Sequence, residues 1–505
     1  MTDLKRMSAL VFLSAGLISC GGGGGGGTQT AQAPVVAAPV SNSAPQVSTA
    51  IPDQDGLVGF DLNFDTTQNG TTFSDADSDA LTYTVTFGRE AGLTATNGVI
   101  SGIPDSAGPI TVTVLAEDPS GESATDTFTL TIGIDQNAVL STFGAKIDLT
   151  VLENYANQPV PDYIGPALVN GNPVTDAGAT LGRVLFYDVN LSIDNSIACA
   201  SCHVQANGFS DLAVVSNGVG SGQTGRHSMR LVNNGFGHDG PGGGASTQFW
   251  DQRAATHEQQ ETMPIQDANE HGFSGQNGAP DFDDLIEKLE GIEYYEELFR
   301  FAFLDPEITE EKIGQALAQF TKSIQSFDSR FDEGLAEVGD FNDAFPNFTN
   351  QENQGKNLFR GQGTGGLNCS ACHQPPEFTI QTGNNRGHNG VVGVANDPLS
   401  FDFTNTRSPS LRDLVNDQGQ LNGPLMHDGS LPSLRAMLDH YSNIPTPGSE
   451  PARTDFLDTL DPRLREGNQA EQFNLSNNQK AAIEAFLLTL SGSNIYTDPK
   501  WSTPF

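Results

Sequence analysis

Cys199-Ala-Ser-Cys202-His203 and Cys369-Ser-Ala-Cys372-His373 are two copies of one pattern, Cys-x-x-Cys-His. Two cysteines at this spacing can form thioethers with the vinyl groups of one haem, and the adjacent histidine then lies under the iron. The two motifs therefore predict two covalently bound haem c groups with His203 and His373 as iron ligands. An alternative, a zinc site or a thiol redox centre, is disfavoured because the two pairs are much farther apart than the pairs of a zinc ribbon.

The first twenty residues are typical of an export signal. Lys5 and Arg6 precede a short apolar stretch, and Leu17-Ile-Ser-Cys20 resembles a bacterial lipobox. This pattern predicts lipidation at Cys20, with an ordinary secretory signal as the alternative. Four of the 5 cysteines belong to the haem motifs, so no disulfide is expected. No other segment is long and apolar enough to span a bilayer. We expect a periplasmic or cell-surface protein that meets the membrane only through its lipid anchor.

The composition narrows the range of partners. Among 505 residues, Asp and Glu exceed Lys and Arg so far that the formal net charge is −38. Such a surface repels nucleic acid and anionic membranes. It would attract a small basic electron-donor protein, although a solvated acidic face without a partner explains the same charge.

The chain changes character several times. Residues 1–20 are the expected signal, and 21–44 form a linker that begins with an unbroken glycine run and continues rich in Thr, Gln, Ala and Pro. Within 45–135, polar and apolar residues alternate over 81–87, 110–115 and 125–132, which predicts a small antiparallel β-sandwich. This region resembles the cadherin-like, immunoglobulin-type repeats of bacterial surface proteins. Its Asp75, Asp77 and Asp79 suit calcium or a plain acidic turn.

From about residue 140 the pattern is helical with long loops. Apolar residues recur at helical spacing over 282–303, 308–327 and 476–490, and Ser476 is a plausible N-cap. Glycine-rich loops are expected at 214–248 and 380–400. The predicted fold is thus a multidomain chain, an N-terminal β-sandwich followed by two mainly α-helical cytochrome c-like domains. Residues 140–340 would form the domain of the first haem motif and 341–505 the domain of the second.

The segment from about 175 to 495 resembles the bacterial dihaem cytochrome c peroxidases and their relative MauG. The resemblance runs through several motifs in order. They are Leu181-Gly-Arg-Val-Leu-Phe-Tyr187, the first haem motif with Gly208-Phe-Ser210, Phe249-Trp-Asp-Gln-Arg253, Asp328-Ser-Arg-Phe331, the second haem motif, Ser408-Pro-Ser-Leu-Arg412 and Met426-His-Asp-Gly429. The family usually has glycine where Gln252 stands.

The resemblance implies roles for three residues around the first haem. Glu270 would move a proton between the two peroxide oxygens, and Gln260 would hydrogen-bond the distal ligand. Trp250 matches the tryptophan that lies between the haems and relays electrons, and it would also serve as a buried anchor. A carboxyl in a closed haem pocket can have its pKa raised enough to supply the proton.

The second haem would be six-coordinate. Tyr441 stands where the peroxidases have methionine and MauG has tyrosine, and a phenolate ligand lowers the reduction potential. Met437 and Met426 are competing ligands, and Met437 alternatively packs in a helix core. The peroxidases' capping histidine, found soon after the first haem motif, is missing; His227 and His238 are alternative caps, and both are expected in surface loops. Position 264 is proline, as in MauG.

The family also holds a calcium ion, partly through backbone oxygens that match Asn422 and Pro424. Asn422 replaces the usual threonine and His227 the usual asparagine, so the calcium ligands of the family are incomplete in this sequence.

Three functions follow from these patterns. The first is a dihaem peroxidase that reduces hydrogen peroxide with electrons from a small redox protein. The second is a MauG-like oxidase that uses peroxide to reach a high-valent state and then oxidises a partner protein or small molecule, which Tyr441 and the missing capping histidine favour. The third, from another class, is a non-enzymatic dihaem electron carrier, which Glu270 and Gln260 oppose.

Overall fold

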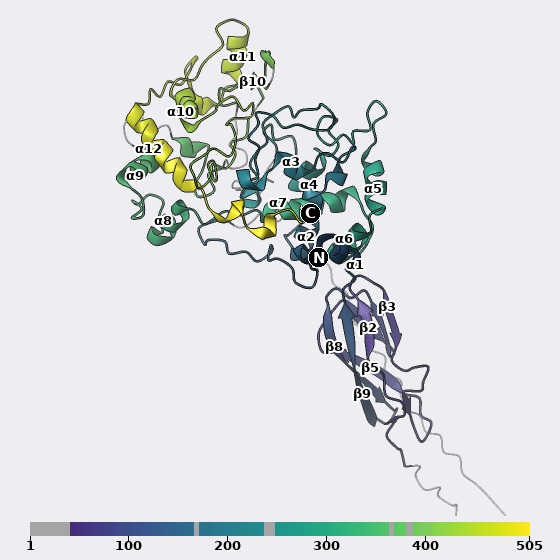
Figure 1. Ribbon diagram of the computed structural model, residues 1–505. Helices are drawn as coiled ribbons and strands as arrows, with labels where there is room; N and C mark the ends of the chain where they lie inside the picture. Colours follow the sequence, from purple (N-terminus) through teal and green to yellow (C-terminus); the bar gives the residue numbers. More distant parts are fainter. Residues whose placement is uncertain are drawn as a thin grey trace, which may run out of the picture.

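The computed structural model describes residues 41–165, 171–236, 248–362, 368–379, 387–395, 397–404 and 406–505. The predicted signal with Cys20 and most of the predicted linker lie outside these residues, as does His238. A β-rich domain projects from a larger helical body, as Figure 1 shows. No helix in the described ranges is long and apolar enough to cross a membrane.

The β-rich domain is a sandwich of two sheets. One sheet has the order β2-β9-β8-β5 and the other β3-β7-β6, with a short β1–β4 pair beside them. The strands are β1 (Gln46–Val47), β2 (Gln54–Leu57), β3 (Leu62–Asp65), β4 (Phe73–Ser74), β5 (Thr82–Phe87), β6 (Leu93–Thr96), β7 (Val99–Gly102), β8 (Gly108–Glu117) and β9 (Ser123–Gly133). Alternate residues of β8 and β9 are buried between the sheets, as the period-two pattern predicts.

The prediction of a purely antiparallel sandwich was wrong at one edge. Strand β2 pairs with β9 in parallel, with Gln54 opposite Leu130. No hairpin joins these two strands, because six other strands lie between them in the chain. A tight turn imposes antiparallel pairing, whereas a long connection allows a parallel pair.

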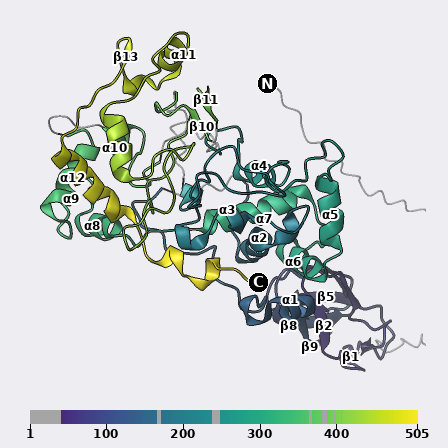
Figure 2. The ribbon, with the colours of Figure 1, turned by 45° about the horizontal axis from the view of Figure 1, so that its top comes forward.

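The helical body consists of short helices and long connections. They are α1 (Asn137–Phe143), α2 (Asp176–Tyr187), α3 (Cys199–Cys202), α4 (His257–Thr262), α5 (Phe282–Glu290), α6 (Glu293–Phe303), α7 (Glu310–Ser323), α8 (Arg330–Val338), α9 (Asn350–Phe359), α10 (Leu434–Ser442), α11 (Ala452–Thr459) and α12 (Asn477–Leu487). Two small hairpins, β10 (Gly393–Val394) with β11 (Asp397–Phe401) and β12 (Arg465–Glu466) with β13 (Gln469–Ala470), lie among the later helices. Helices α8, α9, α10 and α12 gather on one side and α2 to α7 on the other (Figure 2).

The helix predictions hold with local changes. The periodic stretch 282–303 is divided into α5 and α6 at Gly291. Ser476 is the N-cap of α12, and its side chain accepts a hydrogen bond from the Gln479 backbone N–H, as predicted. The expected loop over 380–400 contains β10 and part of β11.

Two helix pairs cross in the same way. At Gly182 in α2, a Cβ atom would lie 2.0 Å from the Ala316 carbonyl oxygen in α7, and at Gly355 in α9 it would lie 1.9 Å from the Ala482 carbonyl oxygen in α12. Only glycine permits such a close approach of two backbones. Each pair lies in its own apolar core, one built mainly from residues 139–324 and the other from residues 331–490.

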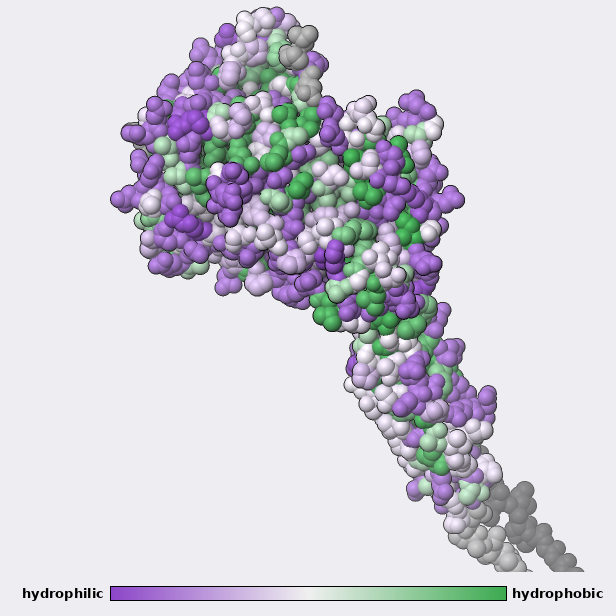
Figure 3. All heavy atoms as spheres, in the orientation of Figure 1, coloured by the Kyte–Doolittle hydropathy of each residue, from purple (hydrophilic) through white to green (hydrophobic). Residues whose placement is uncertain are grey.

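The sandwich joins the body through α6. Arg300 lies over the Phe60 ring, with its guanidinium carbon 3.9 Å from the ring centroid. Phe301 and Leu304 pack against the core of the sandwich. Glu297 accepts hydrogen bonds from two backbone N–H groups at the start of α1. Figure 3 shows hydrophobic atoms on the viewed face in patches over the body and beside this joint.

Candidate active site

The body contains two neighbouring cavities. The larger, of about 490 Å³, is lined by Cys199, Cys202 and His203, and the smaller, of about 110 Å³, by Cys369 and His373. Several residues line both cavities and so form the wall between them; they include Trp250, His227, Arg230, Arg407 and Pro409. Each Cys-x-x-Cys-His motif thus has its own cavity, with one shared wall.

The two motif histidines are held in matching ways. His203 Nδ1 lies 3.1 Å from the Phe209 carbonyl oxygen, and His373 Nδ1 lies 3.2 Å from that of Phe378 and 3.0 Å from that of Pro409. Both phenylalanines have positive φ, +58° and +55°, which turns their carbonyl groups towards the imidazoles. A hydrogen bond from Nδ1 to a backbone oxygen leaves Nε2 free to bind a metal, which is the usual arrangement of an iron-binding histidine.

Electrostatics favour the neutral imidazole that binds iron. Burial lowers the pKa of His203, and it lowers the pKa of His373 to about 4. Burial also raises the pKa of Cys202 and Cys372 to about 11, so these thiols are not activated as redox thiolates. No three His, Cys, Asp or Glu residues of the described chain are grouped to hold a metal ion. The described residues thus give the zinc alternative no support.

Buried arginines in the shared wall fit the two carboxylates that every haem carries. Burial lowers the pKa of Arg230 and Arg407 to about 10, so both remain cations at neutral pH. Arg230 donates to the Ser410 carbonyl oxygen at 3.1 Å, but its buried Nε has no partner among the described residues. A buried cation with an unused donor suits an anionic group at the wall. The donor set and the histidine geometry both fit haem.

Two acid groups of the larger cavity, Glu261 and Glu270, come from α4 and the loop after it. Thr256 caps α4 by accepting a hydrogen bond from the Gln259 backbone N–H, and Gln260, Glu261 and Glu270 all line the cavity. Burial raises the pKa of Glu270 to about 7, and Asp267 raises it further. Burial also raises the pKa of Glu261 to about 7, although Thr321 donates a hydrogen bond to its carboxylate. Two carboxyl groups near half-protonation at neutral pH therefore face one cavity.

A glycine contact fixes the position of Glu270. At Gly218, a Cβ atom would lie 1.7 Å from the Asn269 carbonyl oxygen, so only glycine allows this approach. The next residue, Val219, donates its backbone N–H to the Glu270 carbonyl oxygen at 3.0 Å. The predicted glycine-rich loop thus packs beneath the acid group.

Trp250 lies in a turn with unusual backbone angles. Its indole N–H donates to the His227 carbonyl oxygen at 2.8 Å, and its own carbonyl oxygen accepts the Arg407 backbone N–H at 2.7 Å. Gln252 has φ of +62°. The left-handed region favours glycine, which gives a physical reason for the glycine that the family usually has at this position.

The smaller cavity brings the three candidate iron ligands together. Tyr441, Met437 and Met426 all line it, as does His373. Burial raises the pKa of the Tyr441 hydroxyl. The Asn389 amide donates to the Tyr441 oxygen at 3.3 Å and to the Met426 sulfur at 3.2 Å.

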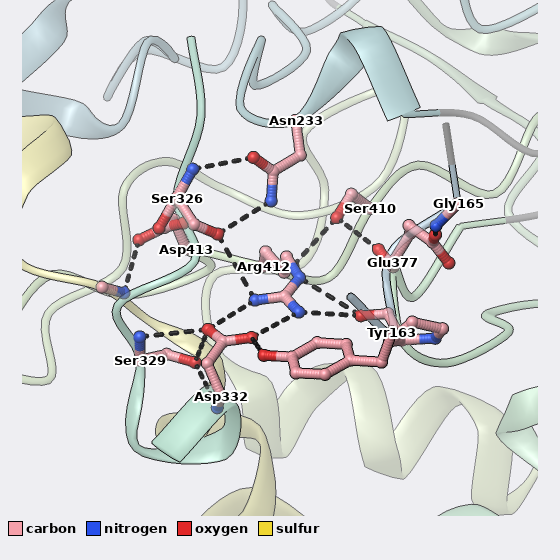
Figure 4. Close-up of polar contacts among 12 residues, drawn as sticks. Tyr163, Gly165, Asn233, Ser326, Ser329, Asp332, Glu377, Ser410, Arg412 and Asp413 are labelled. Carbon is pink, nitrogen blue, oxygen red and sulfur yellow. Dashed lines mark hydrogen bonds and ion pairs between the residues drawn. The ribbon is translucent and has the colours of Figure 1, made fainter. Parts of the chain in front are cut away.

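A buried ion pair supports the segment that reaches His373. Arg412 forms a two-point contact with Asp332 at 2.8 and 2.9 Å and also donates to the Pro376 carbonyl oxygen (Figure 4). Tyr163 donates to the same carboxylate, and Ser329 caps α8 beside it. Pro409 and the turn after His373 both adjoin these contacts. The contacts therefore hold the carbonyl groups of Phe378 and Pro409, which orient the His373 ring.

Two expectations about loop residues change. His227 was predicted on the surface, but it is only 4 % exposed, and its Nδ1 lies 3.0 Å from the Ala213 carbonyl oxygen. It is buried because its backbone joins both Trp250 and His427. In the sandwich, Asp75 accepts the backbone N–H groups of Asp77 and Asp79, which is the geometry of an acidic turn.

The calcium implied by the resemblance fits poorly. The Asn422 amide donates to the Asp413 carbonyl oxygen at 2.8 Å and to the Tyr496 hydroxyl at 2.9 Å. The His227 ring lies at Gly423, with Nε2 3.0 Å from where a glycine Cβ would be. Calcium prefers six to eight oxygen ligands, and an imidazole now fills this position. Pro424 instead lines the smaller cavity.

Sequence reasoning missed four residues of the site. Glu261, Arg230, Arg407 and Asn389 line the cavities, although no motif singled them out. Glu261 could have been predicted from the sequence, because it is an acidic residue that directly follows Gln260, the proposed distal hydrogen-bonding group. The other three depend on contacts between distant segments.

Comparison with known proteins agrees with this geometry. A family model described as di-haem cytochrome c peroxidase matches residues 176–339, and one described as putative Ig domain matches residues 39–133. The methylamine utilization protein MauG of Methylophilus methylotrophus is 30% identical over 339 residues, covering 66% of this chain and 87% of that protein. The cytochrome c551 peroxidase of Nitrosomonas europaea is 28% identical, over 53% of this chain and 73% of its own.

Solved structures agree as well. A MauG-like protein associated with microbial copper homeostasis superposes with a TM-score of 0.53 at 27% identity, over 69% of this chain and 99% of its own. A variant of the dihaem peroxidase BthA from Burkholderia thailandensis shares the fold, with a TM-score of 0.50 at 21% identity over 69% of this chain and 98% of its own. The chain therefore belongs to the dihaem cytochrome c peroxidase and MauG family of oxidoreductases, with an Ig-like domain before the catalytic region.

Proposed function

We propose that the two helical cores are two cytochrome c-like domains, 140–340 with the peroxidatic haem and 341–505 with the electron-transfer haem. The repeated construction supports this division. Each core has a helix pair crossing at one glycine, Gly182 or Gly355, and each motif histidine bonds the carbonyl oxygen of a phenylalanine with positive φ. Cys199 and Cys202 would hold one haem c, and Cys369 and Cys372 the other.

Bound haem supplies an iron that exchanges electrons and binds peroxide. In this proposal, the remaining chemistry belongs to side chains of the larger cavity. Glu270 takes a proton from one peroxide oxygen and returns it to the other, which its pKa of about 7 allows near neutral pH. Gln260 orients the substrate by hydrogen bonding.

Trp250 would carry electrons between the two sites. This role is supported by its place in the wall that both cavities share. Tyr441 would be the second ligand of the electron-transfer iron, with Met437 and Met426 as the alternatives in the same cavity.

Two activities are compatible with this arrangement, and both are oxidoreductase reactions. One is peroxide reduction with electrons from a small donor protein. The other is MauG-like oxidation of a partner protein or small molecule with peroxide as the oxidant. The presence of Tyr441 and His373 in the lining of one cavity favours the second, since phenolate ligation lowers a haem potential. The carrier alternative is not supported, because Glu261 and Glu270 line the larger cavity and relatives such as the cytochrome c551 peroxidase are named as enzymes.

The observation that carries the proposal is the pair Glu270 and His203 in one cavity beside Trp250. The test adds one equivalent of hydrogen peroxide to the fully oxidised holoprotein and follows its optical and near-infrared spectra. A rapid Soret shift with new near-infrared absorption would support the MauG-like reaction. A response that appears only after one haem is reduced would support a reductively activated peroxidase. No response in either state would contradict both.

The location of the protein remains part of the proposal. We infer a periplasmic or cell-surface protein with residues 1–20 as signal, 21–44 as linker and 45–135 as a cadherin-like spacer. Lipid on Cys20 would be its only membrane contact. Mass spectrometry of the mature N-terminus, with a Cys20→Ala variant as control, would detect the lipid or its absence.

A further inference from the structure

Asn389 stands between two candidate ligands of the smaller cavity. Its amide nitrogen lies 3.3 Å from the Tyr441 oxygen and 3.2 Å from the Met426 sulfur. An amide carries two N–H groups, so it can serve both acceptors at once. No other described side chain is recorded with hydrogen bonds to both of these atoms.

The surrounding chain fixes which end of the amide faces the cavity. The Val391 backbone N–H donates to Asn389 Oδ1 at 3.1 Å, so the oxygen is already engaged and the nitrogen points to Tyr441 and Met426. The Asn389 carbonyl oxygen accepts a hydrogen bond from His440 Nε2 at 3.0 Å. His440 directly precedes Tyr441, so the segment carrying the amide is tied to the helix carrying the phenol.

The neighbouring histidine stiffens this segment further. His388 is fully buried, and its Nε2 lies 3.0 Å from the Phe456 carbonyl oxygen. Its backbone N–H donates to the Thr459 carbonyl oxygen, and its own carbonyl oxygen accepts the Asp461 N–H. The amide therefore approaches the cavity from a backbone held at several points, which is what a precise hydrogen bond to a ligand atom requires.

Hydrogen-bond donation affects the two ligand atoms differently. A donor stabilises the deprotonated phenol oxygen, which is the form that binds iron, and it withdraws electron density from it. At the thioether, the same amide engages a lone pair of the sulfur that would otherwise be available to the metal. Both effects favour oxygen ligation over sulfur ligation in this cavity.

We propose that Asn389 is a positioning residue that selects Tyr441 over Met426 as the second ligand of the His373 haem and raises the reduction potential of that tyrosine-ligated haem. The inference rests on the proposed assignment of Tyr441 as a ligand. Tyrosine ligation lowers a haem potential, and the amide offsets part of that decrease. A hydrogen bond to a charged oxygen is worth about tenfold in an equilibrium constant, or about 59 mV for a one-electron couple.

The test compares purified holoproteins with equal covalent haem content by electron paramagnetic resonance and potentiometric titration. Asn389→Leu removes both donors at similar volume, and Asn389→Asp keeps an acceptor for the Val391 N–H while removing the donors. We expect Asn389→Leu to lower the potential of the tyrosine-ligated haem by about 59 mV and to add a second low-spin signal from methionine ligation. A Met426→Leu replacement in that background should abolish the added signal.

Two controls separate this inference from the ligand assignment. Met426→Leu alone keeps the amide–phenol contact and should leave the wild-type signal and potential in place. Tyr441→Phe should change both. If Tyr441→Phe changes the spectra while Asn389→Leu and Asn389→Asp match the wild type, Tyr441 is a ligand and the role of Asn389 is refuted. If Tyr441→Phe also matches the wild type, the ligand assignment itself fails.

Discussion

Replacing Glu270 with glutamine should make the protein more stable at alkaline pH and less active with peroxide. Burial raises the pKa of this carboxyl from 4.5 to about 7 in the folded protein. The folded state therefore holds the Glu270 proton more tightly than the unfolded chain does. Ionising Glu270 opposes folding, and glutamine removes that ionisation while keeping the size of the side chain.

The size of the effect follows from the two pKa values. Below about pH 4.5 both states hold the proton, so the carboxyl costs nothing. Between about 4.5 and 7 the unfolded chain ionises first, and the stability of the wild type falls by about 1.36 kcal/mol per pH unit relative to the variant. Above about pH 7 the difference levels off near 3 kcal/mol in favour of Glu270→Gln. The rate of reaction with peroxide should fall by roughly 10²- to 10⁴-fold, because the proton carrier is gone.

Denaturant unfolding of wild type and Glu270→Gln holoproteins at pH 5, 6, 7 and 8 measures the first quantity, and stopped-flow mixing with peroxide measures the second. Glu287→Gln, at an exposed position of α5, is the matched control and should change neither. A stability difference that stays constant from pH 5 to pH 8 would refute the burial argument. An unchanged peroxide rate would remove Glu270 from the chemistry.

Four further outcomes are expected. Arg412→Met leaves Asp332 buried without its cation and should lower the free energy of unfolding by about 3–5 kcal/mol. Adding Asp332→Asn to this variant should restore part of the lost stability, and a double-mutant cycle by denaturant unfolding measures both effects. Gly182→Ala forces α2 away from α7 and should lower stability by at least about 1–3 kcal/mol in the same assay. Trp250→Phe loses the bond to the His227 carbonyl oxygen, worth about 1 kcal/mol, and should slow electron transfer between the haems in stopped-flow traces. Excess calcium chelator should leave the calorimetric Tm unchanged, because the His227 imidazole fills the position where the family has a calcium ligand; a clear decrease in Tm would contradict that reading.

Local chemistry made part of the site predictable. The haem motifs and the register of Gln260 and Glu270 after Trp250 are short-range features. The Cys and His residues of the motifs line the two cavities, except Cys372, and Gln260, Glu270 and Trp250 line the larger one. The alternating strands and the Ser476 cap are equally local. Such features can be predicted without knowing which distant segments of the chain are in contact.

The remainder depends on long-range contacts. Asn389 and Tyr441 are 52 residues apart, and no sequence pattern in either segment predicts their contact. His227 was misjudged because a polar residue in a glycine-rich loop looks exposed, whereas its backbone bonds bury it. The parallel β2–β9 pair was missed for the same reason, since alternation of side chains does not encode strand direction.

The joint between the sandwich and the body has a consequence for where electrons can enter. Ile134 and Phe301 belong to the packing of both the sandwich core and the first helical core, so the two parts share apolar contacts and do not swing freely. Strand β8 has 10 residues and alone extends about 33 Å.

The sandwich therefore projects from the helical body as a packed extension (Figure 1). If a surface holds the far end of the sandwich, the length of β8 alone separates that surface from the helical body by about 33 Å. A redox partner would then have to reach the body at that distance from the surface.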